Sequence, residues 1–239
     1  LQTPTIYVGI HPKNKNDENK LSSVLAKLKL EDPAIEIIRN AETAQLLIGG
    51  QGMTHIGYLV DKMKSMYNLD VDTSDQRIVY RETIKAKGDA EGRHKKQSGG
   101  SGQFGVVKMR FEPMNPNEKE FEFAEEIHGG SVPKNYFPAV EKGLMETFQK
   151  GPLAGFPVIG VRAVLYDGAY HDVDSNEISF KMAANLAFKN ALPQVKPTIL
   201  EPIMRVEITV KDDYVGDVMG DANKRRGRVL GMDPLPGGR

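Results

Sequence analysis

Residues 165–174 read LYDGAYHDVD, and this stretch marks where a strand ends and a helix begins. The apolar run before it predicts a strand, and the Asp-Gly pair at 167–168 is a strong turn signal. Asp174 with Glu177 three residues later has the pattern of a capping box, so we expect a helix to open at Asp174. His171 would then lie near the end of an exposed loop. We interpret this loop as the working end of the molecule.

The composition is that of an ordinary soluble globular protein of one to three domains: 239 residues, 39% hydrophobic and 27% charged. No apolar run approaches the roughly 18 residues of a membrane span. The absence of cysteine excludes disulfides and thiolate metal sites, and it favours the cytoplasm. The 32 basic and 32 acidic residues give no net charge, which argues against a strongly basic nucleic-acid binder overall. Because the chain begins and ends in strand patterns, we expect it to be a fragment.

Residues 1–80 predict one α+β domain of the ferredoxin-like type, with the order βαββαβ. Along this segment, short apolar runs typical of strands alternate with apolar residues spaced three or four apart, which is typical of helices. We expect strands at 5–10, 35–38, 44–48 and from 69 to beyond 78, and helices at 20–30 and 53–67.

Residues 81–198 predict a second domain that begins with a charged hairpin arm. Five basic residues against two acidic ones give residues 85–96 a local charge of +3 (5 − 2). A solvated arm explains this charge, and so does an arm that contacts phosphates. Further along we expect strands at 103–111, 121–127 and 158–165. A helix follows Pro133 with Ser131 as its cap, and a buried helix runs from Asp174 to about residue 192.

Residues 199–239 predict only the opening β-α-β of a third domain. Strands are expected at 203–210 and from 229, and a helix at 213–222. A basic turn follows this helix and consists of Lys224, Arg225, Arg226 and Arg228.

Several kinds of catalytic site are excluded or unsupported. The glycines at 99–102 are followed by a strand and by no Lys-Ser or Lys-Thr pair, so they do not form a phosphate-binding P-loop. His171, Asp172 and Asp174 are metal-ligand types, but one imidazole and two flexible carboxylates do not complete a ligand set. No Ser-His-Asp constellation is visible in the sequence.

Four long segments resemble the translation elongation factor G family, a family of ribosomal GTPases. They read HKKQSGGSGQFG at 94–105, GGSVPKNYFPAVEKG at 129–143, LYDGAYHDVDSNEISFKMAANLAF at 165–188 and YVGDVMGDANKRRGRVLGMDP at 214–234. The resemblance covers nearly the whole chain, and motifs of this length are highly specific.

The resemblance implies three domains: domain III at 1–80, an S5-like domain IV at 81–198, and the start of a second ferredoxin-like domain, domain V, at 199–239. It implies that the GTPase and β-barrel domains of a parent protein precede them, with GTP and Mg bound there and no cofactor in this chain. Members of the family couple GTP hydrolysis to the movement of tRNA and mRNA by one codon.

The resemblance also implies the partners and contact residues. The partners are the ribosome, with its rRNA, ribosomal proteins and A-site tRNA–mRNA, and the parent's own N-terminal domains; no membrane is involved. Loops expected to contact tRNA and the ribosome comprise Gly129, Gly130, Ser131, Val132, Pro133, Lys134, Asp167, Gly168, Ala169, Tyr170, His171 and Asp172. Expected basic contacts to RNA are Lys95, Lys96, Lys224, Arg225, Arg226 and Arg228. No residue is expected to be catalytic.

Two departures from the family pattern leave other functions open. Gly-Gln-Gly-Met-Thr-His stands at 50–55, where the family usually has Gly-Met-Gly-Glu-Leu-His, and Ser101 replaces a common arginine. A divergent paralogue that protects or recycles ribosomes is therefore one alternative. A free-standing RNA-binding module is another.

Overall fold

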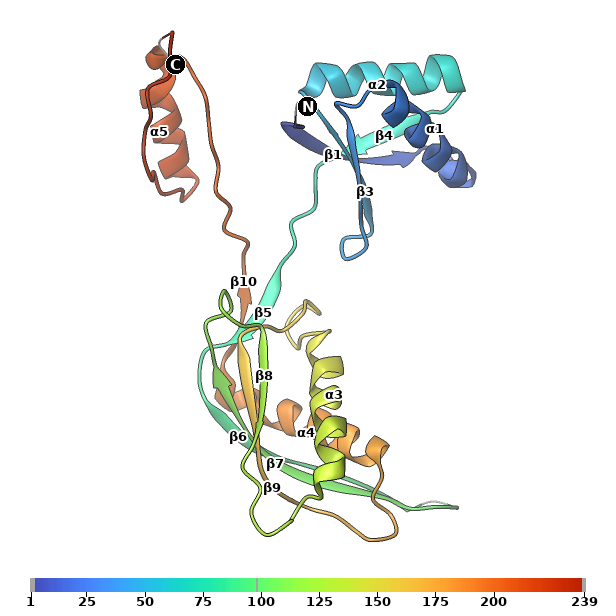
Figure 1. Cartoon of the computed structure of the whole chain (residues 1–239), viewed down its shortest axis with the longest axis vertical. Coiled ribbons are helices and arrows are strands. Elements are labelled where there is room, and N and C mark those ends of the chain that lie inside the picture. Colours follow the sequence, from blue (N-terminus) through green and yellow to red (C-terminus); the bar gives the residue numbers. More distant parts are fainter. Residues whose placement is uncertain (1–2, 98, 238–239) are drawn as a thin grey trace. The chain divides into compact units, whose positions relative to one another are not determined.

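The computed structural model describes residues 3–97 and 99–237 and divides into two units, Leu1–Pro202 and Ile203–Arg239 (Figure 1). The first unit contains two α+β domains, each with its own sheet and its own apolar core. The multidomain α+β class predicted from the sequence is confirmed.

The first domain has the βαββαβ order. Its elements are β1 (Ile6–Pro12), α1 (Glu18–Glu31), β2 (Glu36–Asn40), β3 (Gln45–Gly50), α2 (Met53–Tyr67) and β4 (Val71–Ser74). The four strands form an antiparallel sheet in the order β2-β3-β1-β4. Its core joins side chains of α1 and α2, such as Leu25, Leu28 and Met63, to Val8 and Ile48 of the sheet. The ferredoxin-like prediction is confirmed.

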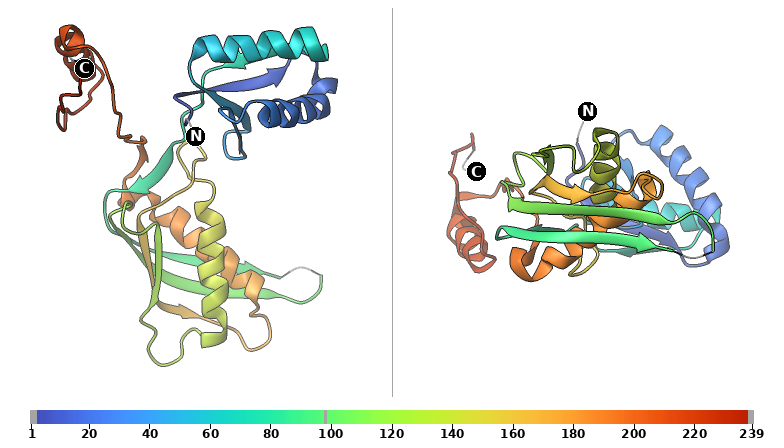
Figure 2. Two further views of the ribbon diagram at one scale, coloured as in Figure 1. Left: turned by 45° about the horizontal axis from the view of Figure 1, so that its top comes forward. Right: turned by 90° about the horizontal axis from the view of Figure 1, so that it is seen from below.

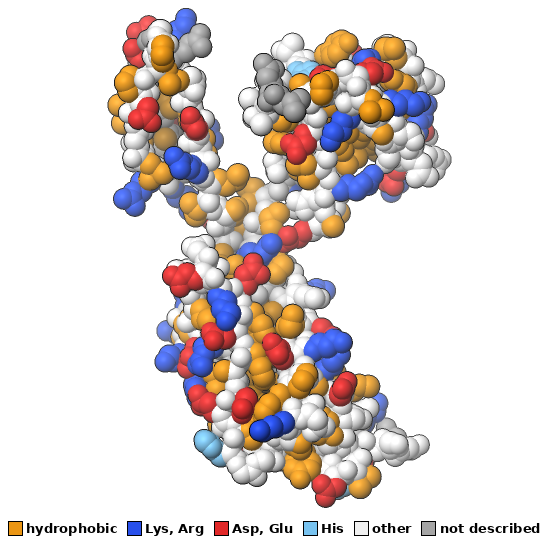
Figure 3. Space-filling view, viewed as in Figure 1, with side chains coloured by type: hydrophobic (Ala, Val, Ile, Leu, Met, Phe, Trp, Pro, Cys, Tyr) orange, Lys and Arg blue, Asp and Glu red, His pale blue; other side chains and the backbone are white. Residues whose placement is uncertain are grey.

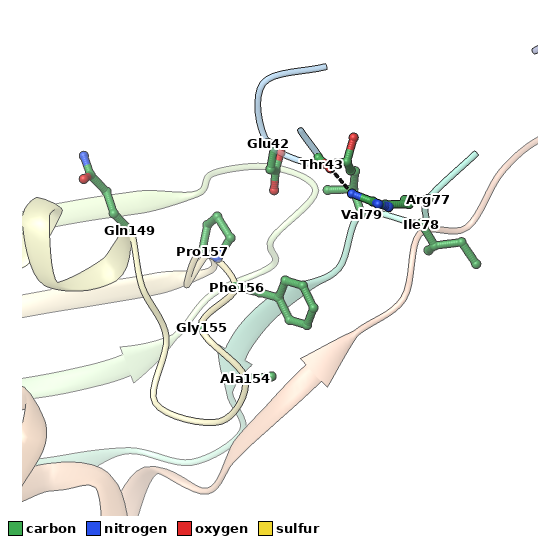
Figure 4. A pocket seen from close by; sticks show the side chains of 10 residues that line it. All are labelled: Glu42, Thr43, Arg77, Ile78, Val79, Gln149, Ala154, Gly155, Phe156 and Pro157. Carbon is green, nitrogen blue, oxygen red and sulfur yellow. Dashed lines mark hydrogen bonds between the residues drawn. The ribbon is translucent and has the colours of Figure 1, made fainter. Parts of the chain in front are cut away.

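Two strand boundaries in this domain differ from the prediction. The glycines at 49–50 were expected to end a strand, but β3 includes both because they pair with β1. The last strand was expected to run past residue 78, but β4 ends at Ser74. The chain after β4 is held by side chains instead. The Arg77 backbone N–H donates to Gln45 Oε1 at 2.9 Å, and the Arg77 guanidinium donates to the Thr43 carbonyl at 2.7 Å (Figure 4).

The second domain is a four-stranded sheet covered on one face by two helices (Figures 1 and 2). The sheet has the order β6-β7-β9-β8, in which only β8 and β9 are parallel. Its strands are β6 (Gly88–Lys96), β7 (Gln103–Pro113), β8 (Phe121–Glu125) and β9 (Val161–Ala169). The helices are α3 (Phe137–Phe148), preceded by a 3-10 turn η2 (Lys134–Tyr136), and α4 (Glu177–Val195).

Small residues let α4 lie directly on the edge strand β6. Ala183, Ala187 and Ala191 recur every four residues on one face of α4, and all three are fully buried. A Cβ on Gly92 would stand 1.8 Å from the Ala183 carbonyl oxygen, so only glycine permits this approach. The sequence predicted a buried helix. The opposite face of α4 is nevertheless exposed, because Ile178 and Met182 point away from the core.

A two-stranded sheet at the base of this domain was not predicted. β5 (Arg81–Ile84) pairs with β10 (Pro197–Leu200), so two segments from opposite ends of the domain's sequence lie side by side. The fully buried carboxylate of Glu82 accepts hydrogen bonds at 2.7–3.1 Å from three backbone N–H groups of the loop at 153–156. A buried carboxylate is stable only when it is satisfied in this way, so Glu82 fastens this loop to the base of the domain.

The stretch at 165–174 folds differently from the prediction. Asp167 and Gly168 form no turn; they lie inside β9, next to a bulge that leaves Tyr166 unpaired opposite β7. A Cβ on Gly168 would stand 2.2 Å from the Val106 carbonyl oxygen, so the glycine serves close strand packing. The following loop is therefore at 170–176.

Helix ends in this domain also differ from the prediction. Asn176, not Asp174, caps α4, because its Oδ1 accepts from the Ser179 N–H at 2.8 Å. The helix continues through Pro193 to Val195, three residues past the predicted end. Ser131 does not cap the helix after it, because η2 intervenes and begins after Pro133.

The second unit contains one helix and no strand among its described residues, 203–237. The helix α5 (Val215–Lys224) follows a short 3-10 turn η3 (Asp212–Tyr214), close to the predicted 213–222. The predicted strands at 203–210 and from 229 are wrong, because a strand needs a hydrogen-bonded neighbour and these segments have none among the described residues. The apolar residues expected to pack on this helix stay half-buried or exposed.

Candidate functional site

Three loops of the second domain lie at the end of its sheet opposite β5 and β10 (Figures 1 and 2). They are the hairpin end between β6 and β7, described at 99–102, the loop at 126–133 after β8, and the loop at 170–176 after β9. We call them the three-loop tip. The sequence predicted the second and third loops as contact loops, and the structure places all three at this end of the domain.

Ser175 joins the three-loop tip through four hydrogen bonds. Its Oγ accepts from the His171 N–H at 2.8 Å and donates to the Phe104 carbonyl, at the start of β7, at 2.8 Å. Its N–H returns a bond to the His171 carbonyl at 3.1 Å. Its own carbonyl accepts from the Tyr136 hydroxyl at 3.0 Å. One residue therefore links the loop at 170–176 to β7 and to the segment after the loop at 126–133.

The His171 ring is oriented by the turn that carries it. Its Nδ1 accepts from the backbone N–H groups of Val173 and Asp174, each at 3.2 Å. Its ring meets that of Phe104 edge to face, with centroids 6.3 Å apart. A nitrogen that accepts cannot carry the proton of a neutral imidazole, so that proton lies on Nε2. The side chain is 54% exposed, and its N–H is a donor available to a partner.

The loop at 126–133 has an open backbone and an anchored end. Gly129 and Gly130 have φ angles of 66° and 68°, a region that favours glycine, and no atom surrounds the position of an added Cβ. Val132 is 1% exposed and belongs to the core, so it holds the loop. Tyr136 adds a second anchor, because its ring stacks on Phe180 with centroids 4.5 Å apart. Backbone can therefore approach a partner closely at the two glycines.

The predicted contact residues occupy three kinds of position. Gly129, Gly130, Lys134, Tyr170, His171 and Asp172 are exposed; Ser131, Pro133, Asp167, Gly168 and Ala169 are half-buried; Val132 is buried. Asp167 lies in β9, where a hydrogen bond from the Gly168 N–H lowers the pKa of its carboxyl group. The buried Val132 anchors the loop at 126–133 to the domain.

Charges on the sheet face opposite the core neutralise one another. Arg110 binds Glu112 at 2.8 Å and Glu126 at 3.2 Å, and Arg162 binds Glu112 at 3.1 Å. The pKa of the Glu112 carboxyl group is lowered, chiefly by the hydrogen bond from Arg110. Burial raises this pKa, and the hydrogen bond from Arg162 lowers it again. Side chains of both signs are interspersed over this domain in Figure 3. This face offers little free positive charge to a polyanion.

Free positive charge gathers on β6 instead. Within the described residues, Arg93, Lys95 and Lys96 are exposed and take part in no ion pair. They precede the hairpin end of the three-loop tip. In the second unit, Lys224 ends α5 and Arg225 binds Asp221 at 2.8 Å, with Arg226 and Arg228 following in an exposed segment. Both predicted basic groups are therefore at the surface.

Metal and membrane features are absent from the part of the chain that the structure describes. Across 3–97 and 99–237, no three His, Asp or Glu side chains are grouped so that they could hold a metal ion. The described helices include none that is long and apolar enough to cross a membrane.

The sequence did not reveal the residues that connect the loops. Tyr136, Ser175 and Phe104 lie in the motifs at 129–143, 165–188 and 94–105, but none of the three was expected to connect the loops. The bonds of Ser175 to Phe104 and Tyr136 span 71 and 39 residues, and no local pattern encodes such a pairing. The only sequence signal for this junction was the position of Ser175, which lies next to Asn176 in the loop that carries His171.

The fold and the site define a multidomain α+β protein in which one domain ends in a set of loops tied to its sheet by hydrogen bonds. Family models match nearly all of it: "Elongation Factor G, domain III" at 1–75, "Elongation factor G, domain IV" at 76–196 and "Elongation factor G C-terminus" at 198–239. The chain belongs to the elongation factor G family.

A solved structure of a protein from Thermus thermophilus is similar to this chain. The two are 42% identical in sequence and superpose with a TM-score of 0.86 over 98% of this chain. This chain spans 35% of the length of that one.

Proposed function

We propose that this chain is the C-terminal part of a translation elongation factor G-like GTPase that promotes tRNA–mRNA translocation, with the three-loop tip entering the decoding region of the ribosome. The observation that carries the proposal is the tip itself, on the domain that matches domain IV, where Ser175 bonds the loop at 170–176 to β7 and to the segment that follows the loop at 126–133. Such a tip can hold an RNA duplex by shape.

The distribution of charge indicates that different residues would contact different parts of the RNA. The tip is exposed and carries no basic side chain at Gly129, Gly130 and His171, so contact there would be to bases and riboses. Lys95 and Lys96 are free to contact phosphates, which adds affinity that does not depend on sequence. The partners are therefore rRNA and the A-site tRNA–mRNA, with ribosomal proteins nearby. GTP and Mg bind in the GTPase domain of the full-length factor, and that factor acts in the cytoplasm.

The test is a pair of His171 substitutions in the full-length factor. His171→Ala removes the ring, whereas His171→Asn keeps a carbonyl oxygen where Nδ1 accepts from the turn and removes the outward Nε2–H. We expect both to slow translocation about five- to tenfold, the effect of losing one hydrogen bond of ordinary strength. Ribosome-stimulated GTP hydrolysis should be unchanged, because the GTP site lies in another domain.

Stopped-flow fluorescence of labelled mRNA measures the translocation step, and phosphate release measures hydrolysis. Met145→Ala, an exposed residue in the last turn of α3, at the end of that helix opposite the loop at 126–133, is the matched control and should translocate at the wild-type rate. If both His171 variants translocate at the wild-type rate, the proposed contact of His171 with RNA is wrong.

A further inference from the structure

The hydrogen bonds of the three-loop tip converge on a residue that would not itself need to touch RNA. Ser175 is half-buried, and its hydroxyl is used twice within the domain, as acceptor from His171 and as donor to Phe104. Its hydroxyl is thus committed to the loops, while the exposed ring of His171 faces outward.

The turn that contains Ser175 also sets the direction of the His171 ring. Reciprocal bonds between His171 and Ser175 close a five-residue turn: N–H to Oγ at 2.8 Å and N–H to carbonyl at 3.1 Å. The closed turn aims the N–H groups of Val173 and Asp174 at Nδ1. If the turn opens, these donors separate from Nδ1. The Asp174 carboxylate, whose Oδ2 lies 3.7 Å from Nδ1, then favours a proton on Nδ1 instead.

The Phe104 side of the junction fixes the turn to the sheet. The Phe104 N–H donates to the Asp174 carbonyl at 3.0 Å, and its carbonyl accepts from Ser175 Oγ. Gly102 leaves room for this contact, because a Cβ there would stand 2.8 Å from the Asp174 carboxyl carbon. Two hydrogen bonds therefore hold the turn to the start of β7.

We propose that Ser175 is a positioning residue: its hydroxyl locks the turn at 171–175 to β7 and thereby holds the His171 ring with Nε2–H presented to an RNA acceptor. The link to RNA rests on the proposed function, but the positioning itself does not. The acceptor class is a phosphate oxygen or a ribose 2′-hydroxyl, since either one takes a single neutral N–H donor.

The test is the tautomer of His171 in the isolated 239-residue chain, read from the ring ¹⁵N shifts by NMR, with His171→Gln used to assign the resonance. In the wild-type chain we expect a single form with the proton on Nε2. Ser175→Ala should give a mixture of both tautomers and exchange the His171 amide proton about tenfold faster, the loss of one ordinary hydrogen bond. Ser175→Thr keeps the hydroxyl and should restore both values.

Controls separate positioning from general loss of structure. The ring signals of His11 and His55, in the first domain, should not change in any variant, and the Ser175→Ala chain should keep the wild-type amide exchange in the β8–β9 pair. An unchanged His171 tautomer in Ser175→Ala would overturn the proposal, as would a failure of Ser175→Thr to restore it.

Translocation by the full-length Ser175→Ala factor distinguishes this inference from the proposed function. A shifted tautomer with slow translocation supports both. A shifted tautomer with wild-type translocation keeps the positioning role and contradicts the role of the tip on the ribosome.

Discussion

At the scale of single residues, the bulge in β9 sets the environment of Tyr166. Its phenol donates to the Asp89 carboxylate of β6 across the open face of the sheet. Burial of the phenol, followed by this hydrogen bond, raises the pKa of Tyr166 to about 12. The neutral phenol is therefore part of what stabilises the sheet.

This raised pKa predicts how stability changes in alkali. Tyrosine in the unfolded chain ionises near a pKa of about 10, below the folded value. The stabilisation is therefore complete below about pH 10 and is lost as pH rises from about 10 to about 12. Tyr166→Phe should flatten this decline in the urea midpoint followed by circular dichroism. Tyr58→Phe, on the exposed face of α2, should leave it as in the wild type. If the urea midpoint falls equally steeply with pH in the wild type and in Tyr166→Phe, the raised pKa of Tyr166 is not what stabilises the sheet in alkali.

Residue-scale features of the three-loop tip were only partly predictable. The exposure of His171 follows from its place in a polar loop between an apolar strand and a helix, and the sequence indicated it. Val132 was expected at the surface, yet it is buried, because the turn made by Gly129 and Gly130 folds the chain back onto the core. A pattern of residue types does not contain the direction of such a turn.

At the scale of elements, close contact between α4 and β6 supports the whole projection. Gly88 and Gly92 on β6 face the alanine stripe of α4, and an added Cβ at either meets α4 within 2.5 Å. At Gly92 this contact is with the backbone of α4, whereas at Gly88 the nearest atom is Val195 Cγ1, so the close backbone approach of β6 to α4 depends on Gly92.

Gly92→Ala tests this contact. Its Cβ would stand 1.8 Å from the Ala183 carbonyl oxygen, so α4 must move, and we expect a loss of about 3 kcal/mol in stability. Gly57→Ala is the matched control, because Gly57 is an exposed residue of α2 with open space around it; it should gain about 0.5–1 kcal/mol. Amide hydrogen exchange reads the two domains separately. Equal protection of α4 in wild type and Gly92→Ala would show that the contact is not tight.

Elements with a local period were predicted well, and those that depend on distant partners were not. α2 was placed at its observed ends because its apolar residues repeat along one face. The pairing of β5 with β10 joins segments far apart in the sequence, and neither segment has a strand period. Pro193 was expected to mark a helix end, yet α4 continues through it because the residues on both sides are buried, including Ala191 and Val195.

At the scale of the whole molecule, long motifs were more informative than composition. A net charge of zero argued against a strongly basic nucleic-acid binder overall, and charge is unevenly distributed: positive side chains are free where β6 approaches the three-loop tip and neutralised on the sheet face. The four motifs identified the family, and the family models agree. The second unit was the least predictable, because the strand patterns at 203–210 and from 229 have no partner strand among the described residues.

The measurement that tests the central claim most directly is toeprinting of pre-translocation ribosomes with the full-length factor and GTP. If the three-loop tip belongs to a translocase, the position at which reverse transcriptase stops on the mRNA moves by one codon. In a control incubation without GTP, the stop stays in place. If the factor hydrolyses GTP on the ribosome and the stop does not move, the same architecture serves ribosome protection or recycling, and the proposed role in translocation is wrong.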